Sequence, residues 1–353
     1  FNGCTLNEPG PYGFFGTNPA DYYDQQSYSF FGEANLPLTD DINFQAAVRR
    51  EEFSGGLGAT VYKISGKWQV FDPLAFRASI GTNFQAPPIT LQPGNITNVV
   101  RSYTVANGAW LAGTSVTRAD VQPEEAESWN VGAIWQSRGF ARDHDIMITL
   151  DYFDIHTMGE IGEIVPHNFI ADSVFTEETR LVDHDNDPTT APIDVTAFYA
   201  DCSHALIGRV DFNDNPISNP GGGCINDTAN MIYTTAGDLN RVTTDIGNGS
   251  DQMTSGFDYQ INYQFPIGSA DLTFGLTGTS LTELTTSART LDGFQVTEAD
   301  DRLGNLNFSS VGFSAPKHRI NAFFNYNQGD HNARLTARYV SGVTDERGSI
   351  DPI

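Results

Sequence analysis

The sequence predicts an all-β protein, built as an antiparallel meander of about ten strands that forms part of a transmembrane β-barrel with long extracellular loops. Three observations lead to this prediction. Apolar and polar residues alternate over many stretches, as in Phe257, Tyr259 and Ile261 against Asp258 and Gln260. Long stretches with apolar residues three and four positions apart, which would indicate helices, are nearly absent. The connections between the alternating stretches are short and long in turn.

The predicted strands alternate with period two, which places apolar side chains on one face and polar side chains on the other. Each is roughly 9 to 14 residues long, close to the length that crosses a bilayer as a tilted strand. The apolar positions, strand by strand, are Tyr28, Phe30, Ala34, Leu36 and Leu38; Ile42, Phe44, Ala46 and Val48; Tyr62, Ile64, Trp68 and Val70; Leu74, Phe76, Ala78 and Ile80; Trp129, Val131, Ala133 and Trp135; Ile146, Ile148, Leu150 and Tyr152; Phe257, Tyr259, Ile261, Tyr263 and Phe265; Leu272, Phe274 and Leu276; Ile320, Ala322, Phe324 and Tyr326; and Leu335, Ala337 and Tyr339.

The connections predict which end of the strands faces outward. Every long connection falls at the same end of the strands, and a meander with short turns at one end and long loops at the other is typical of outer-membrane barrels. The apolar face would then contact lipid, and the polar face would line a lumen. The sheet must close, because lipid offers no hydrogen-bond partners for the backbone N–H and C=O groups of an open strand edge. We therefore expect residues 1–353 to belong to one β-barrel domain, with strands in 25–84, 124–156, 251–283 and 316–343 and outer loops at 1–24, 85–123, 157–250, 284–315 and 344–353.

A soluble, secreted β-protein with an adhesive or structural role is an alternative, because sandwiches and propellers show the same alternation. Soluble strands are shorter on average, at about five or six residues. Aromatic residues also flank the apolar stretches, as the aromatic belts of membrane proteins do. These residues, which favour the membrane barrel, are Tyr28, Trp68, Trp129, Trp135, Tyr152, Tyr263, Tyr326 and Tyr339.

Several stretches resemble the C-terminal part of the barrel of TonB-dependent outer-membrane receptors of Gram-negative bacteria. They are "LAFRASIGTNFQAPPI" (74–89), "PEEAESWNVGAIW" (123–135), "TLDYFDIHTMGEI" (149–161), "TSGFDYQINYQF" (254–265) and "PKHRINAFFNYNQGDHNARLTARYVSG" (316–342), in the order that the family shows. One departure is Gln85, which stands where the family usually has arginine. The resemblance implies a barrel of about 22 strands, of which this chain would hold about strands 10 to 19, with the plug domain outside this chain.

The resemblance also implies a function. The chain would be part of a multi-pass protein of the bacterial outer membrane with its loops facing the cell exterior. It would serve TonB-dependent active uptake of a scarce solute, such as a siderophore or an oligosaccharide. Its expected partners are outer-membrane lipid and lipopolysaccharide, the TonB complex through the missing plug region, and the small-molecule or oligosaccharide ligand. A passive outer-membrane porin of similar form is the alternative.

The net charge and the motifs of the chain argue against a nucleic-acid-binding protein and against an enzyme. The net charge of −25 repels nucleic acid, so we expect no nucleic-acid partner. The chain has no His-Glu-x-x-His motif, nucleophile elbow or phosphate loop. Adjacent acids such as Glu124 and Glu125 would point to opposite faces of a strand and could not act as a catalytic pair. We expect no enzymatic activity and no cofactor.

Two of the cysteines predict a disulfide bond in the longest loop. Cys202 and Cys224 lie in one stretch of the outer loop 157–250, and the cell surface allows disulfides to form. A disulfide between them is favoured over zinc binding, because two thiols with His204 make a poor ligand set. Cys4 would either pair with a cysteine elsewhere or stay free.

The outer loops hold the candidate binding residues. Segment 157–250 contains fifteen Asp or Glu residues against three Arg, which gives it −12 of the net charge and favours a neutral or metal-bridged ligand over a bare polyanion. Its alternating acids suggest a structural calcium site, although Pro188 replaces the usual glycine and a solvated acidic loop is the alternative. The calcium candidates are Asp183, Asp185, Asp187 and Asp194. Loop aromatics could stack on a sugar or siderophore ring, or pack the loops together; they are Tyr103, Trp110, Phe169, Phe175, Phe198, Tyr199 and Tyr233.

Overall fold

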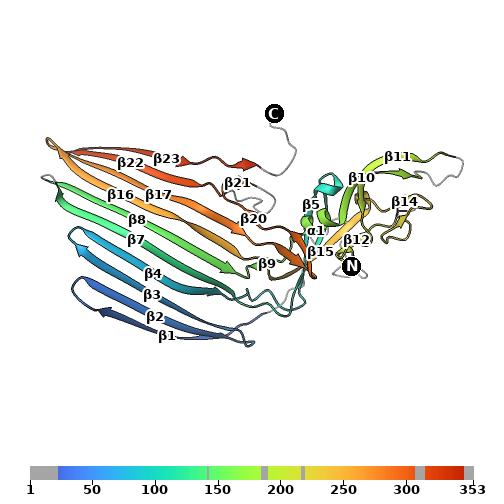
Figure 1. The fold of residues 1–353 in the computed structure, drawn as a ribbon, viewed down its shortest axis with the longest axis horizontal. Coiled ribbons are helices and arrows are strands. Elements are labelled where there is room, and N and C mark those ends of the chain that lie inside the picture. The colour runs from blue at the N-terminus through green and yellow to red at the C-terminus, as the bar shows by residue number, and fades with distance from the viewer. Residues whose placement is uncertain (1–22, 141–142, 184–189, 216–218, 307–314, 346–353) are drawn as a thin grey trace.

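The computed structural model describes residues 23–140, 143–183, 190–215, 219–306 and 315–345. Within these ranges, ten long strands follow one another in a single antiparallel sheet, in the same order as along the chain (Figure 1). This arrangement confirms the predicted meander. The strands are β1 (Ser27–Pro37), β2 (Ile42–Phe53), β3 (Gly58–Phe71), β4 (Leu74–Gln85), β7 (Glu124–Phe140), β8 (His144–Met158), β16 (Gln252–Ile267), β17 (Ala270–Thr286), β22 (His318–Gln328) and β23 (His331–Val340).

Several strands are longer than the sequence indicated. β7 and β17 each have 17 residues and β16 has 16, because the pairing continues past the apolar stretch at the end of the strand where the long loops begin. The two-residue connections 72–73, 268–269 and 329–330 lie at the opposite end. Figure 1 shows the short turns on the left and the long connections on the right.

One face of the sheet carries two rows of aromatic rings. Tyr62 and Trp68 on β3, and Trp129 and Trp135 on β7, are each six positions apart. An even spacing keeps both residues of a pair on one face, about 20 Å apart along the strand. The row near the long loops runs from Trp129 to Tyr152 to Phe257, with ring centroids 5.3 and 5.1 Å apart. The row near the turns includes Phe71 against Trp135, at 6.3 Å.

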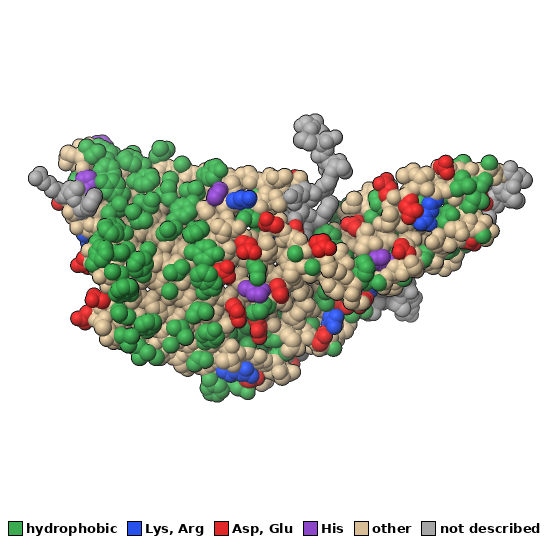
Figure 2. Space-filling view, in the orientation of Figure 1, with side chains coloured by type: hydrophobic (Ala, Val, Ile, Leu, Met, Phe, Trp, Pro, Cys, Tyr) green, Lys and Arg blue, Asp and Glu red, His purple; other side chains and the backbone are tan. Residues whose placement is uncertain are grey.

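These aromatic side chains are open to the surroundings rather than packed into a protein core. Trp68 is 50% exposed and Trp129 is 43% exposed. Figure 2 shows hydrophobic side chains gathered over the sheet, with acidic side chains at its left edge and from its right end outward. An apolar face of this extent that none of the described residues covers is what a lipid-facing barrel wall requires.

The long connections fold together into one structured body, which the sequence did not indicate. We call it the outer body. A sheet in the order β12-β15-β6-β5 forms its centre, and β15 runs parallel to β6, which joins segment 157–250 to segment 85–123. Its elements are β5 (Ile96–Tyr103), β6 (Ala109–Thr117), β9 (Ile161–Glu163), α1 (His167–Val174), β10 (Phe175–Val182), β11 (Ile193–Ala200), β12 (Val210–Phe212), β13 (Asn226–Asp227), β14 (Ile232–Tyr233), β15 (Leu239–Asn248), β18 (Arg289–Leu291) and β19 (Phe294–Thr297), with short 3-10 turns at Thr104–Ala106, Ile207–Arg209 and Ala236–Asp238. Three further two-residue strands in the same connections and beyond β23 are β20 (Asp300–Asp301), β21 (Asn305–Leu306) and β24 (Thr344–Asp345).

The outer body has a hydrophobic core of its own, drawn from all three long connections. Val105 comes from the first, Ile170, Leu206 and Val242 from the second, and Leu291 from the third. Ile170, Leu206 and Val242 are fully buried. Arg209 adds a polar link between the second and third connections, because its guanidinium donates to Asp245 at 2.7 Å and to Asp292 at 2.8 Å.

Helices contribute little to this fold. The α-helix α1 is eight residues long and presents Ile170, Ala171 and Val174 to the core of the outer body. Among the residues that the structure describes, no helix has the length and apolar character needed to span a membrane.

Candidate functional site

The polar face of the long sheet lines a hollow of about 1190 Å³. The side chains that line it alternate in sequence with those of the apolar face, so the same period-two pattern that places tryptophans outside places charges and amides inside. Polar and charged residues of the hollow include Glu33, Asn43, Gln45, Lys63, Ser65, Lys67, Arg77, Ser79, Asn130, Thr149, Asp151, Asp258, Gln260, Thr277, Thr279, Arg319 and Asn321.

An ion pair crosses this wall from strand to strand. Arg77 on β4 lies opposite Gly132 on β7, and Gly132 lies opposite Asp151 on β8. The Arg77 Nε donates to Asp151 Oδ1 at 2.7 Å and Nη2 donates to Oδ2 at 2.6 Å. The side chains can meet over β7 because Gly132 has no Cβ, which would lie 1.9 Å from Asp151 Oδ1. The glycine therefore makes a two-point ion pair possible across two strand intervals.

A second carboxylate stands beside this ion pair. Asp258 on β16 lies directly opposite Asp151 on β8 and accepts a hydrogen bond from the Thr279 hydroxyl at 2.6 Å. Two acids that face each other across a strand pair repel unless a cation or donor compensates them. Arg77 compensates Asp151, and the Thr279 hydroxyl donates to Asp258. Arg319 on β22 lies opposite Thr279 and lines the same hollow.

The structure buries four of the seven predicted loop aromatics. Tyr103 is fully buried, Tyr199 is 1% exposed, and Phe175 and Tyr233 are also buried. Phe169 and Phe198 are partly buried and pack against the core of the outer body. These positions favour the packing role over direct ligand contact. Trp110 on β6 differs, because its side chain is 73% exposed.

Two of the buried tyrosines enclose an arginine near the disulfide. The guanidinium carbon of Arg180 lies 4.8 Å from the ring centroids of both Tyr199 and Tyr233. An arginine between two aromatic rings is stabilised by the negative faces of both. Arg180 also donates to the Asn226 side chain at 3.2 Å, which ties β10 to β13.

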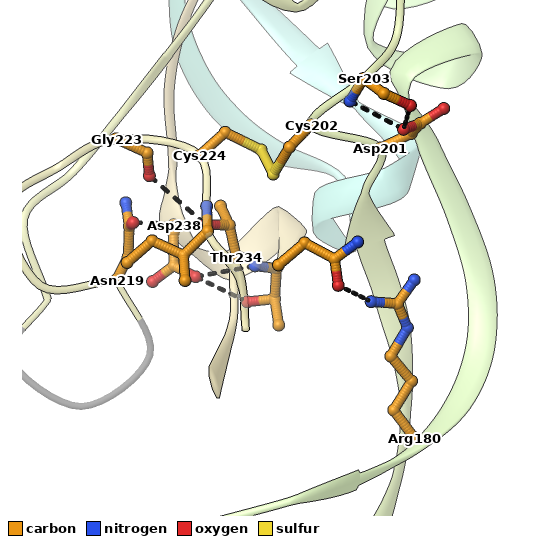
Figure 3. The surroundings of a disulfide bond; sticks show 12 residues. Arg180, Asp201, Cys202, Ser203, Asn219, Gly223, Cys224, Thr234 and Asp238 are labelled. Atoms are coloured by element: carbon orange, nitrogen blue, oxygen red, sulfur yellow. Dashed lines mark hydrogen bonds between the residues drawn. A yellow bond between two sulfur atoms is a disulfide. The ribbon is translucent and has the colours of Figure 1, made fainter. Parts of the chain in front are cut away.

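Cys202 and Cys224 form a disulfide, as predicted (Figure 3). Close to Cys224, the Thr234 hydroxyl donates a hydrogen bond to the Asn219 side-chain oxygen and accepts one from the backbone N–H of Ile225. Asp201, next to Cys202, accepts the backbone N–H of Ser203 at 2.9 Å. The disulfide therefore joins two turns that are each already held by local hydrogen bonds. Cys4 lies outside the described residues.

A buried polar cluster joins two of the long connections. Glu163 of β9 accepts hydrogen bonds from Arg101 at 3.1 Å and from Ser115 at 3.2 Å, and its other oxygen lies 3.5 Å from His167 Nδ1. His167 Nε2 lies 3.1 Å from the carbonyl oxygen of Thr114. Ser115 and His167 are 2% and 0% exposed. Although a serine, a histidine and a carboxylate meet here, the burial of the serine and histidine gives the cluster a role in packing.

The residues of this cluster lower the pKa of the Glu163 carboxyl group. Burial by itself raises the pKa of the Glu163 carboxyl, but hydrogen bonding and charge pairing with His167, aided by Arg101 and Ser115, hold that pKa below its usual value. The ionised carboxylate is therefore the form that stabilises the outer body.

The predicted calcium site is not assembled among the residues that the structure describes. Asp185 and Asp187 lie outside them, and Asp194 lies on β11 opposite Leu181 of β10. Asp183 follows β10, and its backbone N–H donates to the carbonyl of Met231. Within the described ranges, no group of three His, Cys, Asp or Glu side chains is arranged to hold a metal ion. Calcium binding here stays a prediction.

Comparison with known proteins places the fold in one family. The family described as TonB dependent receptor-like, beta-barrel matches residues 2–351. A structure of the ferric enterobactin receptor PfeA from Pseudomonas aeruginosa in complex with enterobactin is 11% identical, with a TM-score of 0.51, and the match covers 92% of this chain and 34% of that one. No curated protein matches the chain.

Two further structures give similar matches. The siderophore receptor PirA from Acinetobacter baumannii is 12% identical over 91% of this chain and 35% of that chain, with a TM-score of 0.48. The hemophore receptor HasR from Serratia marcescens, in complex with its hemophore HasA and heme, is 14% identical over 90% of this chain and 44% of that chain, also with a TM-score of 0.48. The chain thus spans less than half of the length of each of these proteins.

Substitution of Gly132 by alanine should separate Arg77 from Asp151, because the new methyl group occupies the space that the carboxylate needs. We expect a loss of about 1 kcal/mol in the free energy of unfolding, as for an exposed ion pair with good geometry. Urea unfolding of the full receptor in detergent measures this loss. Gly32→Ala is the matched control, because a Cβ there meets nothing within 4 Å. Equal effects of the two substitutions would contradict the assignment.

The lowered pKa of Glu163 predicts an acid-sensitive outer body. A carboxyl group whose pKa is lower in the folded state contributes stability above its unfolded pKa of about 4.3, and this contribution is lost as the pH falls through the folded pKa. Glu163→Gln should therefore cost about 1–2 kcal/mol at pH 7, and this cost should fall toward zero as the pH drops through the lowered pKa of Glu163. Hydrogen exchange of α1 and β15 measures this, with the exposed Glu177→Gln as control. A cost that is independent of pH would show that the charge of Glu163 has no part in it.

Proposed function

The chain belongs to the TonB-dependent receptor-like β-barrel family, and from this premise we propose that it forms wall and outer loops of an outer-membrane receptor for TonB-dependent uptake of a scarce solute. The observation that carries the proposal is the two-faced sheet. Its apolar, aromatic face is exposed, and its polar face lines a hollow wide enough for a small molecule. A soluble β-protein would cover the first face, whereas a membrane barrel leaves it to lipid.

We also propose which neighbours the receptor contacts in the outer membrane. The wall would contact outer-membrane lipid and lipopolysaccharide, and the outer body would face the cell exterior. Coupling to the TonB complex would run through a plug region, as the family resemblance implies. The family match favours this active receptor over a passive porin.

The ligand class follows from charge and exposure in the outer body. Segment 157–250 carries fifteen acids against three arginines, so a neutral oligosaccharide or a metal-bridged siderophore would approach it more readily than a bare polyanion. Trp110, exposed on β6, offers an indole face on which a sugar or a siderophore ring could stack.

The test of function is uptake in cells that express the full receptor or lack it. Labelled siderophores and oligosaccharides are offered in turn, and one of them should accumulate only with the receptor and only while the proton gradient is intact. Receptor-dependent entry that survives collapse of the gradient would support the passive porin instead.

In the same cells, Trp110→Ala should weaken the apparent affinity for that solute about tenfold, because a ring stacked on indole contributes about 1 kcal/mol or slightly more. Leu181→Ala is the control, as Leu181 is another exposed apolar side chain of the outer body. Point variants are preferable to deletion of a loop, since Leu206, Val210 and Phe212 belong to the shared core. Unchanged affinity in Trp110→Ala would remove Trp110 from the binding surface.

A further inference from the structure

The pairing of β3 with β4 ends before either strand does. Their ladder stops at the pair Lys63–Gly81. Beyond this pair, β3 continues to Gly58 beside β2, and β4 continues to Gln85 beside β7. Over these residues, all of which the structure describes, the register of β3 with β4 has no further pair. The wall therefore opens between β3 and β4 at the end where the long loops begin.

A hollow of about 100 Å³ lies in this opening. At its inner end, the backbone N–H of Tyr62 donates to the Thr82 hydroxyl at 3.1 Å, so a side chain takes the place of a backbone partner. Six lining residues belong to the apolar face of the sheet, because each is two or four positions from Ile64, Ile80 or Trp129. These six residues, which define what we call the wall cleft, are Thr60, Tyr62, Thr82, Phe84, Glu125 and Glu127.

The wall cleft borders the row of aromatic rings that lies near the long loops. Tyr62 belongs to this row with Trp129 and forms one side of the cleft. Glu127 and Glu125 are two and four positions from Trp129, about 7 and 13 Å along β7 toward the loops. Aromatic rows mark the membrane–water interface of a barrel. The cleft therefore lies at the height of the lipid headgroups.

The strands that form the wall cleft all have both of their neighbours in this chain. β3 lies between β2 and β4, β4 between β3 and β7, and β7 between β4 and β8. Met158, another lining residue, comes from β8, which lies between β7 and β16. Further strands of a barrel would join the sheet at β1 and β23, away from the cleft. The described residues thus form the sides of the cleft by themselves.

The chemistry of the wall cleft suits the hydroxyl groups of a neutral sugar. Two carboxylates accept hydrogen bonds, two threonines add hydroxyls, and the rings of Tyr62 and Phe84 offer apolar surface to a sugar ring. Neither lysine nor arginine is among the described residues that line it. Arg50 on β2 lies beside the cleft and donates to the Thr60 hydroxyl at 3.0 Å and to Glu52 at 2.7 Å. A phosphate would meet two carboxylates here, whereas sugar hydroxyls would meet acceptors.

We propose that the wall cleft binds the sugar headgroup of a glycolipid in the outer leaflet. The inference rests on the proposed function, because it requires the apolar face to lie in a bilayer. A water molecule occupies about 30 Å³ of the liquid, so the cleft accepts one edge of a sugar ring and leaves the rest of the headgroup outside. The acyl chains of the same lipid then lie against the apolar face beside Trp129.

The experiment uses the full receptor with Trp129 as its only tryptophan, reconstituted in phosphatidylcholine vesicles. The probe is glucosyl dioleoylglycerol with brominated acyl chains, and the reference is an equal fraction of phosphatidylcholine with the same brominated chains. At low fractions, the glucosyl lipid should quench Trp129 several-fold more strongly than the reference, because the cleft holds its chains beside the indole. Brominated dioleoylglycerol without the sugar, and brominated phosphatidylglycerol, should quench no more than the reference.

In the same receptor, the double substitution Glu125→Gln with Glu127→Gln should lower the apparent affinity for the glucosyl lipid about tenfold. Hydrogen bonds to a charged acceptor are stronger than those to a neutral amide. Asp154→Asn is the matched control, because Asp154 lies opposite Trp129 on the same face but is not one of the residues that line the cleft. This control should leave the affinity unchanged.

Four results would overturn the glycolipid site. They are equal quenching by the glucosyl lipid and phosphatidylcholine, equal quenching by the glucosyl lipid and phosphatidylglycerol, an equal loss of affinity in Asp154→Asn, and displacement of the glucosyl lipid by free glucose at the same concentration. The test also separates this inference from the proposed function. Quenching by every brominated lipid alike retains the lipid-facing wall and removes the glycolipid site, whereas no quenching by any of them removes the wall and the receptor with it.

Discussion

The continuous antiparallel ladder from β1 to β23 is the constraint on which the rest of this structure depends. Each strand pairs with its sequence neighbours in the sheet, and a shift of one residue in any pair would exchange its two faces. The ladder supplies the backbone hydrogen bonds that lipid cannot provide. It also aligns residues of distant segments in rows, so that Arg77, Gly132 and Asp151 lie side by side although 74 positions separate Arg77 from Asp151. The aromatic exterior, the polar hollow and the Arg77–Asp151 ion pair are consequences of one register.

The same ladder also brings the long connections together at one end of the sheet. Because all of them leave the sheet at one end, segments from three parts of the sequence can share a core, with Val105, Val242 and Leu291 each contributed by a different connection. Parallel pairing of β6 with β15, the Arg209 link to Asp245 and Asp292, and the disulfide Cys202–Cys224 then hold the outer body as a folded unit. In the receptor that we propose, this unit would set which solutes approach, and the wall below it would set how they pass.

Period-two alternation was sufficient to predict the strands, their order and their two faces, since each depends on residues that are near in sequence. The outer body was not predictable in this way. Its sheet pairs β5 with β6 locally, but β6 with β15 across more than a hundred residues, and no periodic pattern records such a contact. For this reason the sequence left open whether Tyr103 and Tyr199 contact a ligand or pack the loops together, whereas the structure buries both and leaves Trp110 exposed. The ion pair of Arg77 with Asp151 was also missed, because the two residues meet only through the register of β4, β7 and β8.

The lipid-facing wall is tested most directly with the four tryptophans of the chain. Trp68, Trp129 and Trp135 lie on the apolar face of the sheet and Trp110 lies in the outer body. Single-tryptophan variants of the full receptor, reconstituted in bilayers, are titrated with brominated lipid and with aqueous iodide. We expect quenching of the first three mainly by bromine within the acyl chains, and of Trp110 mainly by iodide. Quenching of Trp68, Trp129 and Trp135 by iodide, with no response to brominated lipid, would contradict a lipid-facing wall and with it the receptor.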